Sequence, residues 1–468
     1  MNVKVAIATV LMLSASALAE IKTTRYAGNT GFAVSNNAGT RTTSVIIRTA
    51  NCGFAANTPV AGQSTITCAV DHGLDGTWVG DGLLPKDGTD THVAGIYEIL
   101  SVPSSTTIII SGVLGTTVSD SGFRAGGPWT LADAGKSDSL FGPNPGDTVK
   151  VYVGTGTYPS KWTLGKAGTN TAPITYQACD SNWNALPEGS RHVVSTGATG
   201  DCSIELGADN ITLIGFEGLK TSAAAGNYGI EAITNANGCI LYDCKGTGAQ
   251  IGIYFTSGGN MAVRCVASGC TYGFYGTNVV VFRECYAFDC TYGATVSISP
   301  TLSWCRFRDC TLGIYCLSNS TFPPVIDHCS FHGGTDGIKF VGQTVGCLAH
   351  IANNIFDSQS GYGITADGAF QTLEARNNAF WGCTNVIRSA YFDGRTDDSL
   401  ADAPGVDWAA LTKAPFADVD NDDWSLVAGS EAIDGGTPEY LDCGAQPYGP
   451  YRHSSLRTPW TRALAVVE

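Results

Sequence analysis

The sequence predicts an all-β protein: a right-handed parallel β-helix solenoid with a small N-terminal β module and a C-terminal capping segment. Composition supports this class, since 58 glycines among 468 residues and a charged fraction of 14% suit many short strands joined by tight turns. The strongest observation is an internal repeat, in which like residues recur every 20 to 25 positions between 244 and 378. Because a solenoid grows by adding repeats, a chain of this length need not divide into several globular domains.

The repeat is clearest as columns of like residues. Neighbouring turns of a parallel coil lie about 4.8 Å apart, so the residues of one column should touch and form a ladder. We expect the phenylalanines of the second column to stack inside the coil. The first column is Cys244, Cys265, Cys285, Cys305, Cys329, Asn354 and Asn378. The second, two residues further on, is Gly246, Ala267, Ala287, Phe307, Phe331, Phe356 and Phe380.

Glycine and further cysteines complete the repeat. A glycine column from Gly252 to Gly363 is expected to mark a turn, because glycine supplies the backbone freedom that corners need. Cys270, Cys290 and Cys310 follow the first column by five residues and create C-x4-C pairs. Zinc sites favour shorter spacings and converging ligands, so these pairs indicate buried structural thiols. Disulfides across some turns and a metal site are the alternatives.

The first nineteen residues have the three-part pattern of a signal peptide. Lys4 precedes an apolar run from Val5 to Leu13, and Ala17-Leu18-Ala19 offers a small-residue cleavage site. The apolar run is too short to span a membrane. We therefore expect a secreted, extracellular protein without membrane insertion.

The rest of the chain is expected to contain three segments. The N-terminal module includes Cys52 and Cys68, which lie outside the repeat and are the best candidates for a disulfide in an exported protein. The segments are 20–125 (the N-terminal module), 126–392 (the parallel coil) and 393–468 (the C-terminal cap or tail), after the signal peptide 1–19.

The formal net charge of −15 repels nucleic acid and anionic lipid, so neither is an expected partner.

Several segments carry a likeness to known proteins. They are Gly146–Val149 with Val153–Tyr158, then Ala172–Tyr176, then Asn353–Phe356 and Asn377–Phe380, and finally Asp423–Leu426 with Ser430–Gly436. Over roughly residues 126–448 the chain resembles the secreted right-handed β-helix proteins with pectin-lyase-like repeats. The resemblance implies the fold and, as one assembly, a homotrimer. It does not select a function, because this scaffold hosts lyases, hydrolases, adhesins and viral spikes. Residues 42–118 also resemble a small module of phage attachment proteins.

One column could form a substrate-binding face. Its residues combine aromatic rings with charged and hydrogen-bonding groups, which suits a sugar chain laid along the coil. The alternative is an ordinary exposed strand edge with the rings turned inward. The column, three residues past the first, is Phe288, Arg308, His332, Asp357 and Trp381.

Asp289 and Asp309 are the best pair of candidate catalytic carboxylates, with Arg308 beside them. Equal positions on adjacent turns would bring the two groups close enough to share a cation or to raise one pKa. The alternative, which we favour, is that both lie at solvated turns. The Trp-Ile-Asp-His motif of the lyase family and the Asn-Thr-Asp and Gly-His-Gly motifs of polygalacturonases do not occur in the sequence, and Arg-x-Pro-x-x-Arg occurs only at 457–462, outside the repeat.

Calcium is the one cofactor that the sequence suggests, and only weakly. Asp418, Asp420 and Asp422 alternate as calcium-loop ligands do, but the stretch lacks the glycine and glutamate of an EF-hand. A solvated linker is the alternative.

The absence of these lyase and polygalacturonase motifs from the repeat favours a non-catalytic protein that presents a glycan- or surface-binding face, as an attachment component of a cell surface or virion. A polysaccharide lyase or glycoside hydrolase is the alternative function, and a purely structural spacer is the third.

Overall fold

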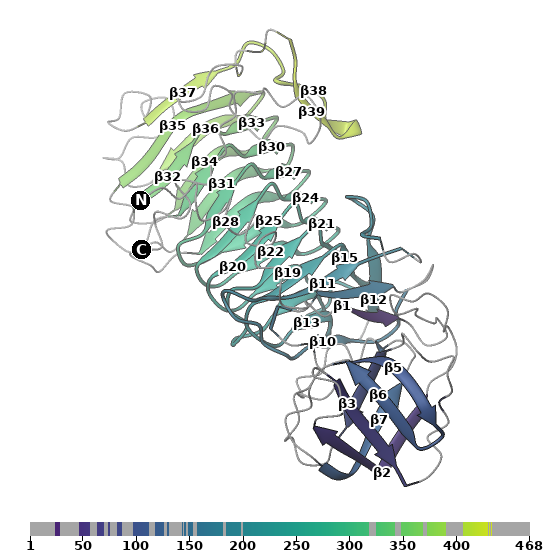
Figure 1. The fold of residues 1–468 in the computed structure, drawn as a ribbon. Coiled ribbons are helices and arrows are strands. Elements are labelled where there is room, and N and C mark those ends of the chain that lie inside the picture. Colours follow the sequence, from purple (N-terminus) through teal and green to yellow (C-terminus); the bar gives the residue numbers. More distant parts are fainter. Residues whose placement is uncertain are drawn as a thin grey trace, which may run out of the picture. The chain divides into compact units, whose positions relative to one another are not determined.

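The computed structural model shows an all-β protein whose main body is a right-handed parallel β-solenoid (Figure 1). The predicted fold class is therefore confirmed. Regular structure in the described residues is β-strand apart from the 3-10 turn η3 (Val419–Asn421). The structure describes residues 24–28, 46–56, 63–69, 74, 82–86, 97–111, 118–125, 129–130, 143, 145–146, 148–152, 157–180, 184–197, 200–317, 324–341, 348–367, 372–389, 406–428, 430 and 432. The predicted signal peptide lies outside these residues.

The chain forms two compact units. One contains the described residues of 159–161 and 188–432, and the other contains those of 24–158 and 162–187. Within the part of the chain that the structure describes, no helix has the length and hydropathy to span a bilayer.

The larger unit is a coil whose every turn contributes strands to three parallel ladders. The first ladder is β14 (Ile211–Ile214), β17 (Ile240–Tyr242), β20 (Asn260–Val263), β23 (Val280–Arg283), β26 (Thr301–Ser303), β29 (Val325–Asp327), β32 (Leu348–Ala352) and β35 (Thr372–Trp381). The second is β12 (His192–Gly197), β15 (Phe216–Lys220), β18 (Lys245–Thr247), β21 (Val266–Ser268), β24 (Tyr286–Phe288), β27 (Arg306–Arg308), β30 (Ser330–His332) and β33 (Ile355–Asp357), which continues into β35. The third is β13 (Cys202–Leu206), β16 (Tyr228–Ala232), β19 (Ile251–Phe255), β22 (Tyr272–Gly276), β25 (Tyr292–Val296), β28 (Leu312–Leu317), β31 (Asp336–Val341), β34 (Tyr362–Asp367) and β36 (Asn385–Ser389).

The predicted ladders form the core of the coil. The four phenylalanines stack face to face, with ring centroids 5.1 Å apart for Phe307 and Phe331, 4.7 Å for Phe331 and Phe356, and 4.7 Å for Phe356 and Phe380. The column cysteines are buried and free. Their thiols donate to carbonyl oxygens of the preceding turn, as from Cys285 Sγ to the Ala262 oxygen at 3.3 Å. They therefore act as small apolar side chains with a weak donor.

The glycine column serves a different purpose from the one expected. Its members lie within the strands of the third ladder, and none has a positive φ. A Cβ at Gly313 would lie 2.5 Å from Phe331 Cδ1, and a Cβ at Gly363 would lie 2.3 Å from Phe380 Cε1. From Gly293 to Gly363 the stacked rings fill the space of a side chain, whereas at Gly252 and Gly273 a backbone oxygen of the next turn does so, at 2.7 and 2.5 Å from the added Cβ. The predicted turn position was therefore wrong.

In each turn of the coil, residues with a left-handed backbone (positive φ) lie at two positions outside the glycine column. One directly precedes the cysteine and asparagine column, where Glu284, Trp304 and Asn353 have φ between 55° and 59°. The other contains Gly269 and Gly333 and also Asp289 and Asp309, at φ 53° and 51°. Aspartate tolerates this conformation better than most residues, which explains why it alternates with glycine here.

The smaller unit contains a closed antiparallel barrel and a short parallel ladder. The barrel strands are β2 (Ile46–Ala56), β3 (Gln63–Cys68), β6 (Thr107–Ser111), β5 (Tyr97–Ser104), β4 (Gly82–Lys86) and β7 (Val118–Ala125). The other strands are β1 (Thr24–Gly28), β8 (Trp129–Thr130), β9 (Thr148–Tyr152), β10 (Trp162–Leu164) and β11 (Ile174–Ala178). Only part of the predicted module 20–125 is barrel, because β1 pairs in parallel with β8 and β9. Cys68 is disulfide-bonded, and the strand register places Cys52 opposite it. This register suits the predicted Cys52–Cys68 pair, which stays a prediction.

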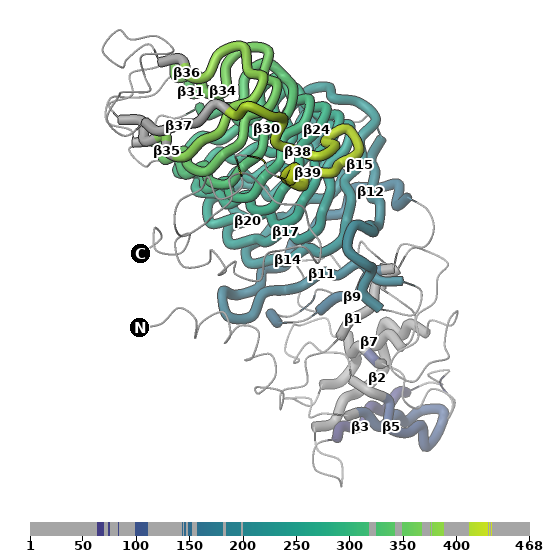
Figure 2. The backbone as a smooth tube through the Cα atoms, turned by 90° about the horizontal axis from the view of Figure 1, so that it is seen from above, coloured from purple at the N-terminus to yellow at the C-terminus, as the bar shows by residue number. Residues whose placement is uncertain are grey.

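The C-terminal segment extends the coil and then folds back along it. β37 (Val406–Ala410) pairs in parallel with β35, so the ladder continues beyond the predicted boundary at residue 392. β38 (Phe416–Asp418) and β39 (Asp423–Leu426) follow as an antiparallel hairpin around η3. We call residues 416–426 the C-terminal hairpin; it lies beside β24 and β30 (Figure 2).

Candidate functional site

The predicted substrate-binding column is a true ladder, but it is not an open face. Its five residues pair in succession across β24, β27, β30, β33 and β35. None of the five side chains is exposed, and Asp357 is only 4% accessible. Phe288 and Trp381 pack against a cluster that includes Phe416 and Trp424 of the C-terminal hairpin. The column therefore seats the hairpin, which corrects the expectation of an outward-facing surface.

Arg308 holds the C-terminal hairpin through Asp422. The Asp422 Oδ1 atom accepts hydrogen bonds from Arg308 Nη1 and from the Tyr286 hydroxyl, both at 2.6 Å. Arg308 Nη1 also donates to the Val419 carbonyl oxygen at 3.1 Å. Burial, and then the hydrogen bond to Asp422, raise the pKa of Tyr286, so its hydroxyl stays a donor. A guanidinium engaged in this way is not available to neutralise a uronate.

His332 and Asp357 form an internal pair. The His332 Nδ1 atom lies 2.8 Å from Asp357 Oδ2, and the Ser358 hydroxyl donates to the other carboxylate oxygen at 2.7 Å. The hydrogen bond to Asp357 raises the pKa of His332, while burial opposes the shift. Asp357 therefore already has two partners within the protein, and one of them is His332 Nδ1.

The three candidate calcium ligands do not converge. Asp422 is taken up by Arg308 and Tyr286, and Asp418 Oδ2 accepts a hydrogen bond from Asn421 Nδ2 at 2.7 Å. Among the described residues, the set of three or more acidic, thiol or imidazole groups whose ligand atoms lie within 4.8 Å of one another is Asp201, Cys202 and Glu205. Lys161 already serves as their cation, since its Nζ lies 3.0 Å from Asp201 and 2.7 Å from Glu205. Calcium at 418–422 stays a prediction without geometric support.

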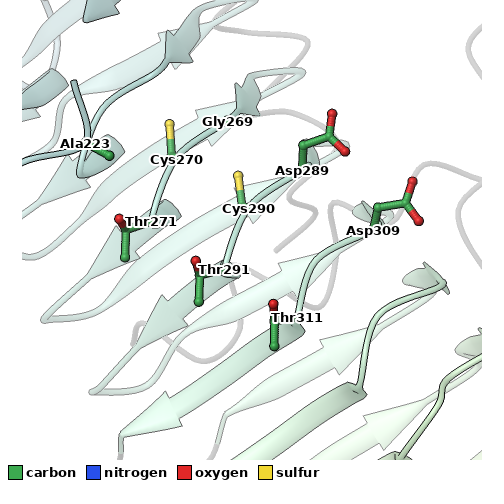
Figure 3. A pocket seen from close by; sticks show the side chains of 9 residues that line it. All are labelled: Ala223, Gly269, Cys270, Thr271, Asp289, Cys290, Thr291, Asp309 and Thr311. Atoms are coloured by element: carbon green, nitrogen blue, oxygen red, sulfur yellow. The ribbon is translucent and has the colours of Figure 1, made fainter. Parts of the chain in front are cut away.

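Asp289 and Asp309 lie side by side at the rim of a shallow depression (Figure 3). The depression has a volume of about 460 Å³ and is lined by Ala223, Gly269, Cys270, Thr271, Asp289, Cys290, Thr291, Asp309 and Thr311. Both carboxylates are exposed and point the same way, and Arg308 Nε is 3.6 Å from Asp309 Oδ2. They occupy the left-handed turn position that glycine fills elsewhere, which supports the favoured alternative of solvated turn residues.

Beside this depression, the outer surface of the third ladder carries a continuous run of tyrosines. Thr271 and Thr291 of the depression directly precede Tyr272 and Tyr292, which stack with ring centroids 4.9 Å apart. Their neighbours join at 5.2 Å (Tyr228 and Tyr254), 5.3 Å (Tyr254 and Tyr275), 5.4 Å (Tyr272 and Tyr275) and 5.1 Å (Tyr292 and Tyr315). We call these six residues the tyrosine face. They lie on β16, β19, β22, β25 and β28.

The rings of the tyrosine face are half-buried. All six side chains have intermediate accessibility. Burial is the main cause that raises the pKa of Tyr228, Tyr254 and Tyr275. These three hydroxyls can therefore donate and accept at neutral pH, while each of the six rings offers an apolar surface.

Carboxylates border one end of the tyrosine face. Glu205 and Glu231 are register partners, and Glu231 is followed in the same column by Tyr254. Burial, and then the charge of Glu205, raise the pKa of Glu231. Hydrogen bonds to Glu205 and Asp201 raise the pKa of Lys161 although burial acts to lower it, so Lys161 remains a cation. Two carboxyl groups in different environments thus lie next to an aromatic surface.

The tyrosine face was not among the predicted sites, although the sequence contains a signal for it. Thr-Tyr-Gly recurs at 271–273 and 291–293, and Tyr275 follows Tyr272 by three residues. The outward direction of these tyrosines depends on where each strand of the third ladder begins, and the glycine column, predicted to be a turn, lies within these strands.

A comparison with family models supports the fold. Residues 228–380 match the family model described as right handed beta helix region. This part of the chain is a right-handed β-helix region, as the sequence predicted. A comparison with curated proteins gave no match.

A comparison with solved structures matched, among others, two phage tailspikes and a glucanase. The Gp54 tailspike of Acinetobacter baumannii bacteriophage AP22, in complex with capsular saccharide, is 10% identical at a TM-score of 0.26, with 83% of this chain and 68% of that chain covered. The tailspike gp49 of Pseudomonas phage LKA1 is 13% identical at 0.19, with 74% and 61% covered. The catalytic domain of a GH87 alpha-1,3-glucanase, in complex with tetrasaccharides, is 12% identical at 0.27, with 76% and 91% covered. At these TM-scores the likenesses carry no argument about this chain.

Proposed function

We propose that this protein is a secreted β-helix that binds a glycan on the tyrosine face without cleaving it, as an attachment or structural component of a cell surface or virion. One observation carries the proposal: six tyrosines form an unbroken run of ring contacts on the outside of a coil whose core is complete without them. Aromatic rings pack against the apolar faces of sugars, and tyrosine hydroxyls form hydrogen bonds with sugar hydroxyl groups.

The neighbouring depression adds polar groups to the same surface. Thr271, Thr291 and Thr311 form a row of hydroxyls, and Asp289 and Asp309 offer exposed carboxylates at the rim. A glycan chain that runs from turn to turn would meet both the rings and these acceptors. The run of stacked rings extends across five strands, so the surface is suited to several sugar units rather than one.

Affinity electrophoresis with the full chain tests the proposal. Gels contain galactomannan, xylan, β-glucan, polygalacturonate or alginate, with and without calcium. We expect at least one polysaccharide to retard the protein. The double variant Tyr272→Ala, Tyr292→Ala should weaken this binding roughly thirtyfold, because each aromatic contact contributes about 1 kcal/mol. Tyr242→Ala is the matched control, since Tyr242 is an equally half-buried tyrosine on the first ladder.

Two outcomes would contradict the proposal. If none of the five polysaccharides retards the protein, the structural spacer becomes the better description. If the double variant binds as the wild type does, or if Tyr242→Ala weakens binding as much, the glycan does not lie on the tyrosine face.

Glu231 supports the alternative function, a glycoside hydrolase or polysaccharide lyase. Burial and the neighbouring Glu205 raise the pKa of Glu231, and a carboxyl group with a raised pKa is what general acid catalysis uses. The same incubations therefore include assays for reducing ends and unsaturated products. Turnover that Glu231→Gln abolishes would establish the enzyme, whereas turnover lost only in Asp309→Asn would place the chemistry at the depression.

A further inference from the structure

Thr295 is a buried hydroxyl without a partner beneath the tyrosine face. Its side chain is 1% accessible, and Thr295 Oγ1 makes no hydrogen bond within the described part of the chain. On strand β25 the flanking Ala294 and Val296 belong to the buried core. Successive side chains of a strand point to opposite faces, so Thr295 points outward.

The surroundings of Thr295 are the rings of the tyrosine face. Its register partners on the two neighbouring strands are Tyr275 and Tyr315. Tyr292 lies three residues earlier on the same strand, and its ring is 5.1 Å from that of Tyr315. The short threonine thus lies in a row of long aromatic side chains, with rings on both sides.

A hydroxyl in this position is unfavourable for the free protein. A buried polar group without a partner loses its hydrogen bonds to water and gains none in return. Valine has nearly the same shape and would fill the site without that loss. The fold alone therefore gives no reason for a hydroxyl here, whereas a ligand that supplies a partner does.

We infer that Thr295 is a recognition residue of the tyrosine face, whose hydroxyl becomes hydrogen-bonded to a sugar hydroxyl when the glycan binds. The inference rests on the proposed function and deepens it. As the sugar enters, the Tyr292 and Tyr315 rings move apart, and one sugar hydroxyl takes the space between them and reaches Thr295 Oγ1. The ligand class is a polyhydroxylated chain, because either a donor or an acceptor on the sugar can satisfy Thr295 Oγ1.

The same column contains a control for this argument. Thr365 on β34 is also 1% accessible, and its Oγ1 is likewise without a partner in the described residues. Its register partners are Lys339 and Arg388, so it lies outside the tyrosine face. A purely structural role for such hydroxyls predicts equal behaviour at the two positions. Glycan recognition predicts an effect at Thr295 alone.

The experiment compares Thr295→Val, Thr295→Ser and Thr365→Val by affinity electrophoresis in the polysaccharide that most retards the wild type, with melting temperatures measured in parallel. Thr295→Val should keep or raise the melting temperature and weaken binding roughly five- to tenfold, the equivalent of one hydrogen bond. Thr295→Ser, which keeps the hydroxyl, and Thr365→Val should bind as the wild type does.

Three results would overturn the inference. Thr295→Val could bind with unchanged affinity, the two valine variants could weaken binding equally, or Thr295→Ser could lose as much as Thr295→Val. In each case the wild type still binds, so the proposed function survives. A wild type that no polysaccharide retards removes the proposed function as well, which separates the two failures.

Discussion

Packing of the glycine column against the phenylalanine column should appear as strong energetic coupling between Gly363 and Phe380. A Cβ at Gly363 would lie 2.3 Å from Phe380 Cε1 and 2.7 Å from Phe380 Cδ1, whereas the nearest backbone atom, the Val386 oxygen, is 3.0 Å away. The ring is thus the main obstacle. Phe380 is itself 3% accessible and stacks on Phe356, so it cannot move aside without losing core contacts.

These distances set the expected free energies. Gly363→Ala should destabilise the fold by about 2 kcal/mol, the usual cost of forcing one extra carbon into a packed core. Phe380→Ala should cost about 3 to 4 kcal/mol through lost burial and a cavity. In the double variant the new methyl group occupies space that the ring has left. Its total cost should therefore stay near that of Phe380→Ala alone, with a coupling of about 2 kcal/mol.

Denaturant unfolding of the wild type, both single variants and the double variant measures this coupling. Circular dichroism at the β-sheet band follows unfolding, and each difference is taken from midpoints at a common slope. Gly269→Ala is a useful contrast, because φ is 62° there and no atom lies within 4 Å of the added Cβ. Its cost comes from the backbone and should not change with Phe380. Additive costs for Gly363→Ala and Phe380→Ala would refute the packing explanation.

Two further predictions concern the C-terminal hairpin and its seat. Asp422→Asn should loosen the C-terminal hairpin, because it removes the ion pair with Arg308. The cost should be only about 1 kcal/mol, because the Asp422 side chain is 59% exposed and solvent screens the pair. Faster amide hydrogen exchange at 416–426 with unchanged exchange in β25 would show this, and exchange rates at 416–426 equal to those of the wild type would contradict it. The pKa of His332 is raised in the fold, so its protonated form stabilises the protein below the unfolded pKa of about 6.5, and that contribution is lost as the pH rises through the folded value. Unfolding at pH 5 to 8 should therefore show a decline in stability that His332→Gln flattens, and identical pH profiles would exclude His332 as the cause.

The repeat alone was enough to predict the coil, its ladders and its stacked phenylalanines. Equal residues at a fixed period must touch in a parallel coil, so Phe307 to Phe380 could be placed inside without coordinates. The turns were harder to assign, because glycine is used both where the backbone is left-handed, as at Gly269, and where a ring leaves no room, as at Gly313. The residue is glycine in both cases, and only its neighbours in the folded structure distinguish the two.

The candidate site depended on tertiary structure more than the fold did. Sequence placed Phe288, Arg308 and Trp381 in one column, and this is correct, but it could not show that the C-terminal hairpin, which follows them in the chain, packs on them. The repeat was enough to align the residues of the tyrosine face, but whether their side chains point outward depends on which residue begins each strand. Periodicity fixes which residues are neighbours, because strand spacing is constant. Exposure is decided by the segments that pack on the coil afterwards, and their docking depends on contacts such as Asp422 to Arg308 that no local pattern specifies.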